Sequence, residues 1–145
     1  MRVAASILLP VRPEAAWAFL LRWEEQPRWM GDAATVRVLS WQREGVGTRL
    51  AVRTRVLNVP LFTEELEVVG WDPPRRLVVA HRSFLRGLGT WTLDPAGPGT
   101  RFTWTEELSL PLPALGELAL LAYRPVLRRL MRAGLARSRE LVALE

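Results

Sequence analysis

The side chains with the clearest capacity for chemistry are two glutamates and the single histidine of the chain. Glu64 and Glu106 each lie in a segment where polar and apolar residues alternate, as they do along a β-strand. Successive strand residues point to opposite faces of a sheet, so apolar residues two positions away, such as Leu66 and Trp104, place both carboxylates on the inner face. Glu106 and His81 are the catalytic candidates, because a ring closure or a dehydration needs proton transfer in a dry site.

The inward position of His81 depends on the register of its strand. The residues before it, Leu77–Ala80, are apolar on both faces, so a shift by one residue would bury Arg82 instead. The carboxylates also have an alternative role, since they could pair with arginines and only hold the sheet together. The arginines considered for such pairs are Arg53, Arg82 and Arg101. The sequence leaves these alternatives open.

The same alternation predicts the lining of a cavity between a sheet and a helix. Pairing through the turns places Thr54 opposite Glu64 and Gly89 opposite Glu106. The residues predicted to line the cavity are Trp29, Thr54, Glu64, Leu66, His81, Ser83, Trp91, Trp104, Glu106, Leu118, Ala122 and Val126. A mostly apolar wall with a few polar groups is typical of a small-molecule site. The alternative is that the tryptophans simply fill a closed core.

The elements that must hold these residues follow from hydrophobic periodicity and from turn residues. The strand-like segments are Val3–Leu9, Thr35–Trp41, Thr48–Leu57, Leu61–Trp71, Arg76–Phe84, Thr90–Leu93 and Thr100–Leu110. Two short helices follow the first strand, one from Pro13 and one at Arg28–Met30. Residues 111–145 form one long helix, which Pro125 is expected to kink near Leu121. This order predicts one α+β domain over residues 1–145, with a curved seven-stranded antiparallel sheet around the C-terminal helix.

Composition excludes several classes of enzyme. The chain has 145 residues, of which 49% are hydrophobic, and this suffices for a core without disulfides or metals. It contains no cysteine, and all 20 basic residues are arginine, so thiolate and lysine chemistry is absent. No spacing of metal ligands, no nucleophile elbow and no phosphate loop occurs. We therefore expect no metal and no cofactor. Without a signal peptide or a membrane-spanning stretch, the expected location is cytoplasmic.

The order of several short motifs resembles a known superfamily. The motifs are Ser6–Pro10 with Pro13–Trp17, then Trp29, Gly45–Thr48, Asp72–Leu77, and Gly89–Leu93 leading to Gly99–Arg101. They resemble the polyketide cyclase/dehydrase and lipid-transport group of the START-like (SRPBCC) helix-grip superfamily over essentially the whole chain. The resemblance implies a helix-grip fold. It implies no single activity, because the superfamily includes lipid carriers, hormone binders, cyclases and coenzyme Q chaperones. It also carries no catalytic residue over to this sequence.

Three functions remain after these considerations. The leading interpretation is a carrier or binding protein for a lipid, an isoprenoid or a polycyclic, polyketide-like molecule. The alternative is a cyclase or dehydratase that uses an inward glutamate as acid and base. A second alternative follows from the net charge of +5 and from an arginine face on the last helix, formed by Arg124, Arg128, Arg132 and Arg139. That face would bind nucleic acid, a ribosome or an anionic membrane, and nucleic acid ranks last among the partners. Ligand identity and oligomeric state do not follow from the sequence.

Overall fold

The computed structural model describes the whole chain, residues 1–145. Its elements, in chain order, are β1 (Arg2–Leu9), α1 (Pro13–Leu20), the 3₁₀ helix η1 (Trp23–Arg28), β2 (Ala33–Val38), β3 (Arg49–Val56), β4 (Val59–Asp72), β5 (Arg76–Arg82), β6 (Arg86–Ala96), β7 (Gly99–Ser109) and α2 (Leu115–Val142). No helix of the chain is long and apolar enough to cross a lipid bilayer.

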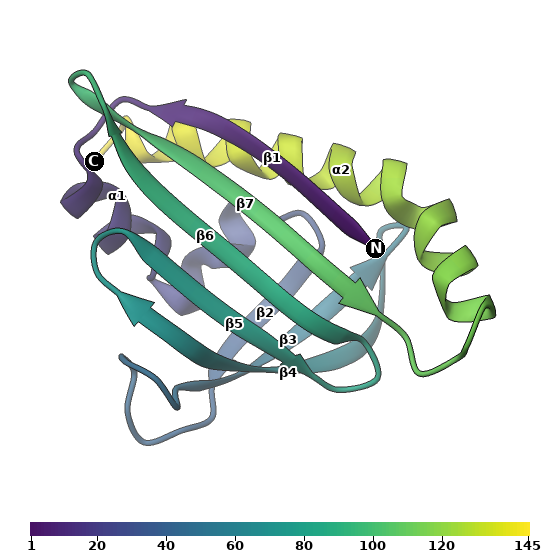
Figure 1. The fold of residues 1–145 in the computed structure, drawn as a ribbon. Helices are drawn as coiled ribbons and strands as arrows, with labels where there is room; N and C mark the ends of the chain where they lie inside the picture. The colour runs from purple at the N-terminus through teal and green to yellow at the C-terminus, as the bar shows by residue number, and fades with distance from the viewer.

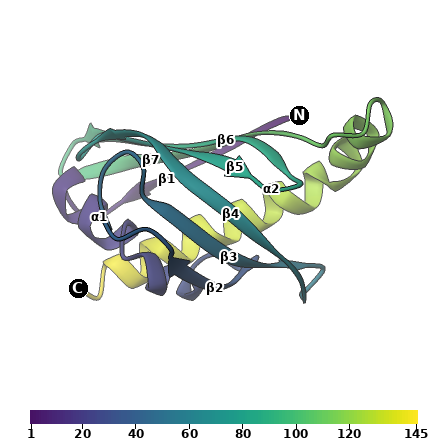
Figure 2. The same cartoon turned by 90° about the horizontal axis from the view of Figure 1, so that it is seen from below.

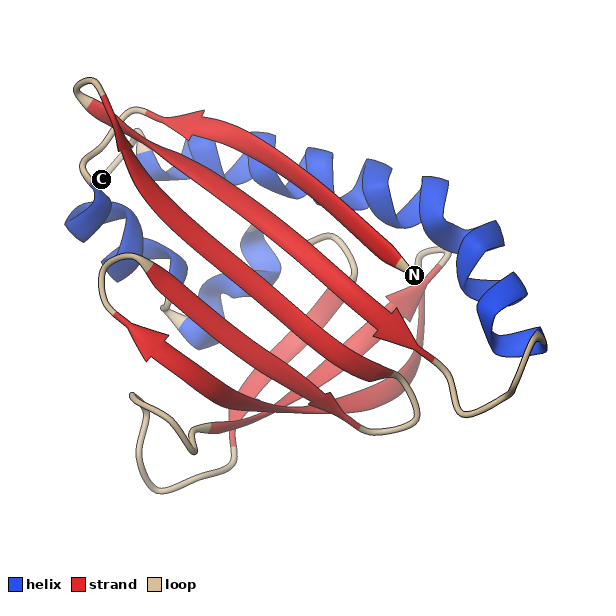
Figure 3. Ribbon diagram, in the orientation of Figure 1, coloured by secondary structure: helices blue, strands red, loops and turns tan.

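The strands form one seven-stranded sheet in the order β1-β7-β6-β5-β4-β3-β2, and every neighbouring pair is antiparallel. The sheet curls strongly, and α2 lies across its open side (Figures 1 and 2). The short helices α1 and η1 cover one end of the curl (Figure 3). The predicted α+β helix-grip fold is therefore confirmed.

Irregular pairing around the long strand β4 accounts for much of the curl. Register shifts occur between Val68 and Gly70 against β5, and between Thr54 and Arg55 of β3. Such bulges bend a strand and increase its right-handed twist. The two halves of the sheet thus face each other across a concave surface (Figure 2).

Strand β6 differs from the prediction of a glycine corner followed by a short strand. It runs without interruption over Arg86–Ala96 and contains both Gly87 and Gly89. Gly87 has a φ of +129°, and a Cβ there would collide with the backbone carbonyl of Glu107. The glycines therefore allow close packing inside a strand, where the sequence pattern alone indicated a turn.

The second short helix lies earlier than predicted. It spans Trp23–Arg28 and not Arg28–Met30, and Pro27 lies inside it. Its anchor is the buried side chain of Gln26, whose Nε2 donates to the carbonyl of Leu20 at 2.9 Å. Proline tolerates this position because its fixed φ is compatible with a helical turn.

Helix α2 is shorter than predicted and changes direction in its first half (Figure 1), and it contains Pro125. Beyond this proline its buried side chains include the predicted Leu127, Met131, Leu135, Leu141 and Val142. Before the proline, two leucines of the predicted apolar face are largely in solvent: Leu115 and Leu118 are 71% and 63% exposed. The first turns of the helix therefore extend past the sheet.

Aromatic side chains fill the opposite end of the curl. Trp29 packs against Trp91, Phe102 and Trp104 with ring centroids 5.5 to 6.3 Å apart. Helix α2 approaches this cluster at Gly134, where an added Cβ would lie 2.9 Å from the carbonyl oxygen of Trp29. The tryptophans thus close one end of the interior, as the filled-core alternative expected, but only that end.

Candidate functional site

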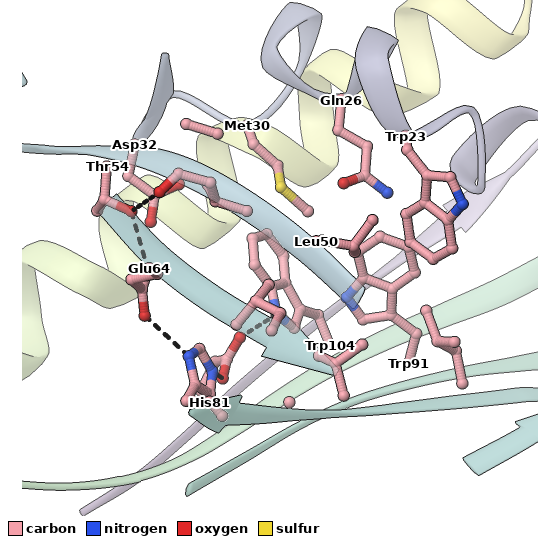
Figure 4. A pocket seen from close by; sticks show the side chains of 17 residues that line it. Trp23, Gln26, Met30, Asp32, Leu50, Thr54, Glu64, His81, Trp91 and Trp104 are labelled. Carbon is pink, nitrogen blue, oxygen red and sulfur yellow. Dashed lines mark hydrogen bonds and ion pairs between the residues drawn. The ribbon is translucent and has the colours of Figure 1, made fainter. Parts of the chain in front are cut away.

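Two carboxylates hold the only histidine between them. His81 Nδ1 lies 2.9 Å from Oε1 of Glu64, and its Nε2 lies 3.0 Å from Oε2 of Glu106. These side chains are 9 to 11% exposed, and Figure 4 shows the imidazole facing Glu64. We call these three residues the Glu–His–Glu cluster.

Glycines make the cluster possible. His81 and Glu106 come from β5 and β7, which are separated by β6. On β6, Gly87 pairs with His81 and Gly89 pairs with Glu106. An added Cβ at Gly89 would lie 3.0 and 3.1 Å from the two carboxylate oxygens of Glu106. Because β6 carries no side chain at these positions, the imidazole reaches across it to the second carboxylate.

The outer carboxylate oxygens also accept hydrogen bonds. Thr54 Oγ1 donates to Oε2 of Glu64, and Trp104 Nε1 donates to Oε1 of Glu106, each at 2.9 Å. Every carboxylate oxygen of the cluster therefore has one donor from the protein. This arrangement meets the requirement that buried charges be both paired and hydrogen-bonded.

The histidine of the cluster is a cation at neutral pH. Burial disfavours the charged imidazole, but the hydrogen bonds to Glu106 and Glu64 and their negative charges outweigh burial and raise the pKa of His81 to about 10. Both ring nitrogens therefore act as donors. His81 serves the carboxylates as a fixed cation, and no nitrogen is left to accept a proton.

Asp32 is a fourth ionisable group at the site, and the sequence interpretation missed it. It lies between η1 and β2, and its carboxyl faces the same space as the cluster (Figure 4). Burial raises the pKa of Asp32 to about 6; its own backbone amide and His81 oppose this shift, and the charges of Glu106 and Glu64 add to it. Its position directly before a strand that begins with the buried Ala33 was the available signal, but a Gly-Asp pair reads as a plain loop.

The cluster lies between two hollows of unequal size. The larger, which we call the main cavity, has a volume of about 550 Å³, and the smaller pocket about 80 Å³. Six residues line both: Asp32, Thr54, Glu64, His81, Trp104 and Glu106. The main cavity extends from this polar boundary toward the β3–β4 hairpin, the β5–β6 turn and the first turns of α2, which lie at the right of Figures 1 and 2.

Most residues predicted to line a cavity on the sheet do lie beside one of these hollows. Thr54, Glu64, His81, Ser83, Trp104 and Glu106 line the main cavity. Leu66 and Trp91 line the small pocket. Trp29 lines neither, because its ring is buried among the other aromatic side chains.

The helix positions were predicted wrongly. Leu118, Ala122 and Val126 do not line the cavity, whose helix wall is formed by Ala119, Leu120, Tyr123 and Leu127. A kink at Pro125 was expected, but the change that it makes in the inward-facing residues before it does not follow from the sequence. One residue corresponds to about 100° around a helix, so a small change of phase at the bend redirects every side chain before it.

Register details also differ from the prediction. Glu64 lies opposite Val52, and Thr54 lies opposite Phe62. Thr54 nevertheless bonds Glu64, because residues two apart on a strand share a face. Gly89 lies opposite Glu106 as predicted.

The arginine alternatives are resolved by the geometry. His81 is the inward residue of β5, whereas Arg82 is exposed and lies 4.0 Å from Glu67. Arg53 donates to Thr63 and to a backbone carbonyl, and Arg101 donates to Ser6. Neither inward glutamate pairs with an arginine, so this alternative does not hold, and both carboxylates pair with His81 instead.

On the outer side of α2, four arginines line a shallow groove of about 310 Å³: Arg124, Arg128, Arg129 and Arg132. Arg124 Nε donates to the backbone carbonyl of Arg2 at 2.8 Å.

No group of three or more histidine, cysteine, aspartate or glutamate side chains is arranged to hold a metal ion.

Comparison with known proteins agrees with this architecture. The model of the family described as polyketide cyclase/dehydrase and lipid transport matches residues 1–143. The chain belongs to this family. A search of curated protein sequences found no significant relative.

Members of the START superfamily and aromatase/cyclases are among the similar solved structures. The protein TTHA0849 from Thermus thermophilus has a TM-score of 0.80 at 24% identity, covering 99% of this chain and 98% of that one. The ZhuI aromatase/cyclase from Streptomyces sp. R1128 has a TM-score of 0.81 at 14% identity, covering 99% and 93%. A START superfamily protein from Mycobacterium smegmatis has a TM-score of 0.72 at 14% identity, covering 97% and 98%. At these identities the likeness concerns the fold of this family member and not its activity.

Proposed function

We propose that this protein binds a hydrophobic small molecule in the main cavity, as a binding protein or carrier. The observation that carries the proposal is a hollow of about 550 Å³ in which 11 of the 19 lining residues are hydrophobic. This volume lies within the range of roughly 300–1,000 Å³ typical of ligand sites. Membership in a family described by polyketide chemistry and lipid transport supports an apolar ligand.

The direct test looks for a ligand that is already present. Native mass spectrometry of freshly purified protein should show an adduct of lipid-like mass. Fatty alcohols, isoprenoids and polycyclic dyes should quench tryptophan fluorescence saturably, because Trp104 lines the cavity. A panel that gives neither an adduct nor saturable quenching would contradict the proposal.

A variant with a filled cavity provides the control. Val56 and Leu85 both line the main cavity, and replacing both by phenylalanine should weaken binding at least about tenfold while the protein stays folded. Leu8→Phe is the matched change at an exposed position outside the cavity and should leave binding unchanged. Equal affinity of both variants would place the ligand elsewhere.

A cyclase or dehydratase is the second candidate, and Asp32 favours it. Its pKa of about 6 is close to the working range of a general acid or base, and it faces the same cavity as Glu106. His81 is less suited to the proton transfer first considered for it, since both its nitrogens already donate to carboxylates. In this reading Glu106 and Asp32 carry protons and His81 positions Glu106.

The enzyme proposal has its own test. Glu106→Gln keeps the size of the side chain and its capacity to accept a hydrogen bond from Trp104, but it removes the basic carboxylate. On a polyketide or isoprenoid substrate this variant should lose turnover by at least about 100-fold while it still binds the substrate. Unchanged turnover would reject Glu106 as the base.

A further inference from the structure

The Glu–His–Glu cluster has no hydrogen-bond donor left for a ligand. The two imidazole N–H groups, the hydroxyl of Thr54 and the indole N–H of Trp104 all point at oxygens of Glu64 and Glu106. A carboxylate offers about four lone-pair sites, and each of these two accepts only two bonds from the protein. The cluster therefore presents spare acceptors, and no spare donors, to whatever enters the cavity.

Asp32 extends this acceptor surface. Its carboxyl takes part in none of the side-chain hydrogen bonds or ion pairs that hold the cluster, yet it lines the main cavity beside them. Ionised, it adds two further acceptor oxygens.

The charge of the site is negative in either state of the histidine. Two carboxylates and one imidazolium sum to −1, and a neutral imidazole would make the sum −2. Arg55 is the only arginine along the wall, and its Nη1 donates to the carbonyls of Gly31 and Ala33. No lysine exists in the chain. The carbonyls of Gly31 and Ala33 are neutral, so Arg55 keeps its charge, but its hydrogen bonds hold it against residues 31–33, and the charged groups presented at the cluster itself are carboxylates. An anionic ligand whose head group lies at the cluster would therefore meet net negative charge.

The other side-chain donors that line the main cavity are the remaining N–H groups of Arg55 and the hydroxyls of Thr63, Ser83 and Tyr123. Ser83 Oγ accepts from the backbone amide of Glu65 and keeps its own proton free. Tyr123 lies on the helix wall, and burial and the charge of Asp32 raise its pKa above the usual value. Neutral hydroxyls do not offset the repulsion between a ligand carboxylate and the cluster, since a buried charge requires an opposite charge as well as hydrogen bonds.

We infer that the main cavity selects ligands whose inner end donates hydrogen bonds and carries no negative charge. An alcohol, a phenol or an ammonium group on a hydrophobic body meets this condition, and a fatty acid or a phosphate ester does not. The inference rests on the proposed binding function and specifies its ligand class. Spare carboxylate lone pairs would receive the ligand's donor, and the apolar body would lie along the wall toward α2.

The experiment compares head groups on the same body. Dodecanol, dodecylamine and dodecanoate form one series, with naphthylmethanol, naphthylmethylamine and naphthylacetate as a second, bicyclic series. Affinities are measured at neutral pH by displacement of a fluorescent dye from the full-length protein. In each series that binds, the alcohol and the amine should bind at least about tenfold more tightly than the carboxylate, because like charges in an apolar site repel strongly.

Charge-neutral variants link the preference to the cluster. The double variant Glu64→Gln with Glu106→Gln should bring the carboxylate to within about threefold of the alcohol. Asp32→Asn is a milder variant that should reduce the discrimination in part, and it serves if the double variant does not fold. Glu65→Gln is the matched control, since Glu65 lies on the same strand but is exposed, and it should keep the full preference.

The outcomes separate the two proposals. If neither series binds, the proposed function fails and the ligand class fails with it. If ligands bind but the carboxylate matches or exceeds the alcohol, binding stands and the inference is overturned. The same holds if the preference survives in the double variant, because the cluster would then not be its source.

Discussion

At the scale of single residues, His81 is the group on which the interior depends. It supplies the only positive charge in contact with two buried carboxylates, and its two hydrogen bonds span 17 and 25 residues of sequence. Removing one partner from a buried charged group is costly, because the charges left behind lose their compensation. Removing the charge of one member of the cluster should therefore change the free energy of unfolding of the protein measurably.

Replacing His81 by leucine should therefore destabilise the protein by about 3–5 kcal/mol. The two carboxylates would then face each other without a cation. Adding Glu64→Gln and Glu106→Gln to this variant removes the repulsion and should recover more than half of the loss. Urea unfolding of the single and the triple variant measures both effects. A single variant as stable as the parent protein would show that the cluster contributes no net electrostatic stabilisation.

Removing the charge of Asp32 should stabilise the protein, whereas removing the charge of His81 should destabilise it. Its pKa is about 6 in the folded protein and near 3.8 in the unfolded chain, so the folded state binds the proton more tightly. Its stabilising contribution is complete below pH 4 and is lost as the pH rises through 6. Asp32→Asn should raise the free energy of unfolding at pH 8 by on the order of 1–3 kcal/mol and have little effect at pH 4.

The control for this effect is an aspartate in solvent. Asp94 is exposed, and Asp94→Asn should change stability little at either pH. Thermal unfolding at the two pH values distinguishes the cases. A gain at pH 4 equal to the gain at pH 8 would mean that the asparagine acts through packing and not through charge.

At the scale of elements, α2 packs closely against the tryptophan cluster at Gly134. Gly134→Ala would normally favour a helix by about 1 kcal/mol. Here the new methyl group would lie 2.9 Å from the carbonyl oxygen of Trp29, so α2 must move outward. We expect a net destabilisation of about 1–3 kcal/mol, measured by urea unfolding.

The adjacent position on α2 tests whether glycine is favoured only where the helix contacts Trp29. Ala133 is exposed, and Ala133→Gly should cost about 1 kcal/mol through helix propensity alone. Glycine would then be preferred at one position and disfavoured at the next. If Gly134→Ala stabilised the protein instead, the close approach to Trp29 would not constrain the helix.

The predicted and observed elements agree in the strands and differ at the glycines of β6. Alternation predicted the seven strands and the inward faces of Glu64 and Glu106, because period-two patterns report directly on burial. It did not distinguish a corner from a continuous strand at Gly87 and Gly89, since the requirement there is the proximity of β7 and not a turn. Asp32 was missed for a similar reason: its backbone carbonyl accepts a hydrogen bond from the amide of Arg55 on β3, a long-range contact that local sequence patterns do not report.

At the scale of the whole molecule, the interior divides into a filled end and a hollow end. Tryptophans occupy the first, and the main cavity of about 550 Å³ occupies the second. Both sequence interpretations, a closed core and a hollow, therefore apply to different parts of one interior. The helix wall of the hollow could not be predicted because the bend in the first half of α2 changes which of its residues face inward.

Occupation of the hollow end should stabilise the whole fold. A ligand that binds only the folded protein adds about 2.7 kcal/mol at a concentration 100 times its Kd. A bound dodecanol or isoprenoid should therefore raise the melting temperature in proportion to the logarithm of its concentration. The double variant Val56→Phe with Leu85→Phe should need at least about tenfold more ligand for the same rise, and an unchanged response in that variant would indicate binding outside the cavity.

The hydrogen bonds of His81 have a consequence for how the strands find their partners during folding. Residues 77–80 are apolar on both faces, so burial of hydrophobic surface alone would tolerate a slipped alignment of β5. In a slipped sheet the guanidinium of Arg82 would replace the imidazole, and both 2.9–3.0 Å hydrogen bonds would be lost. The Glu–His–Glu cluster thus favours the observed register of β5 over a slipped one. His81 specifies an alignment that the surrounding aliphatic residues do not specify.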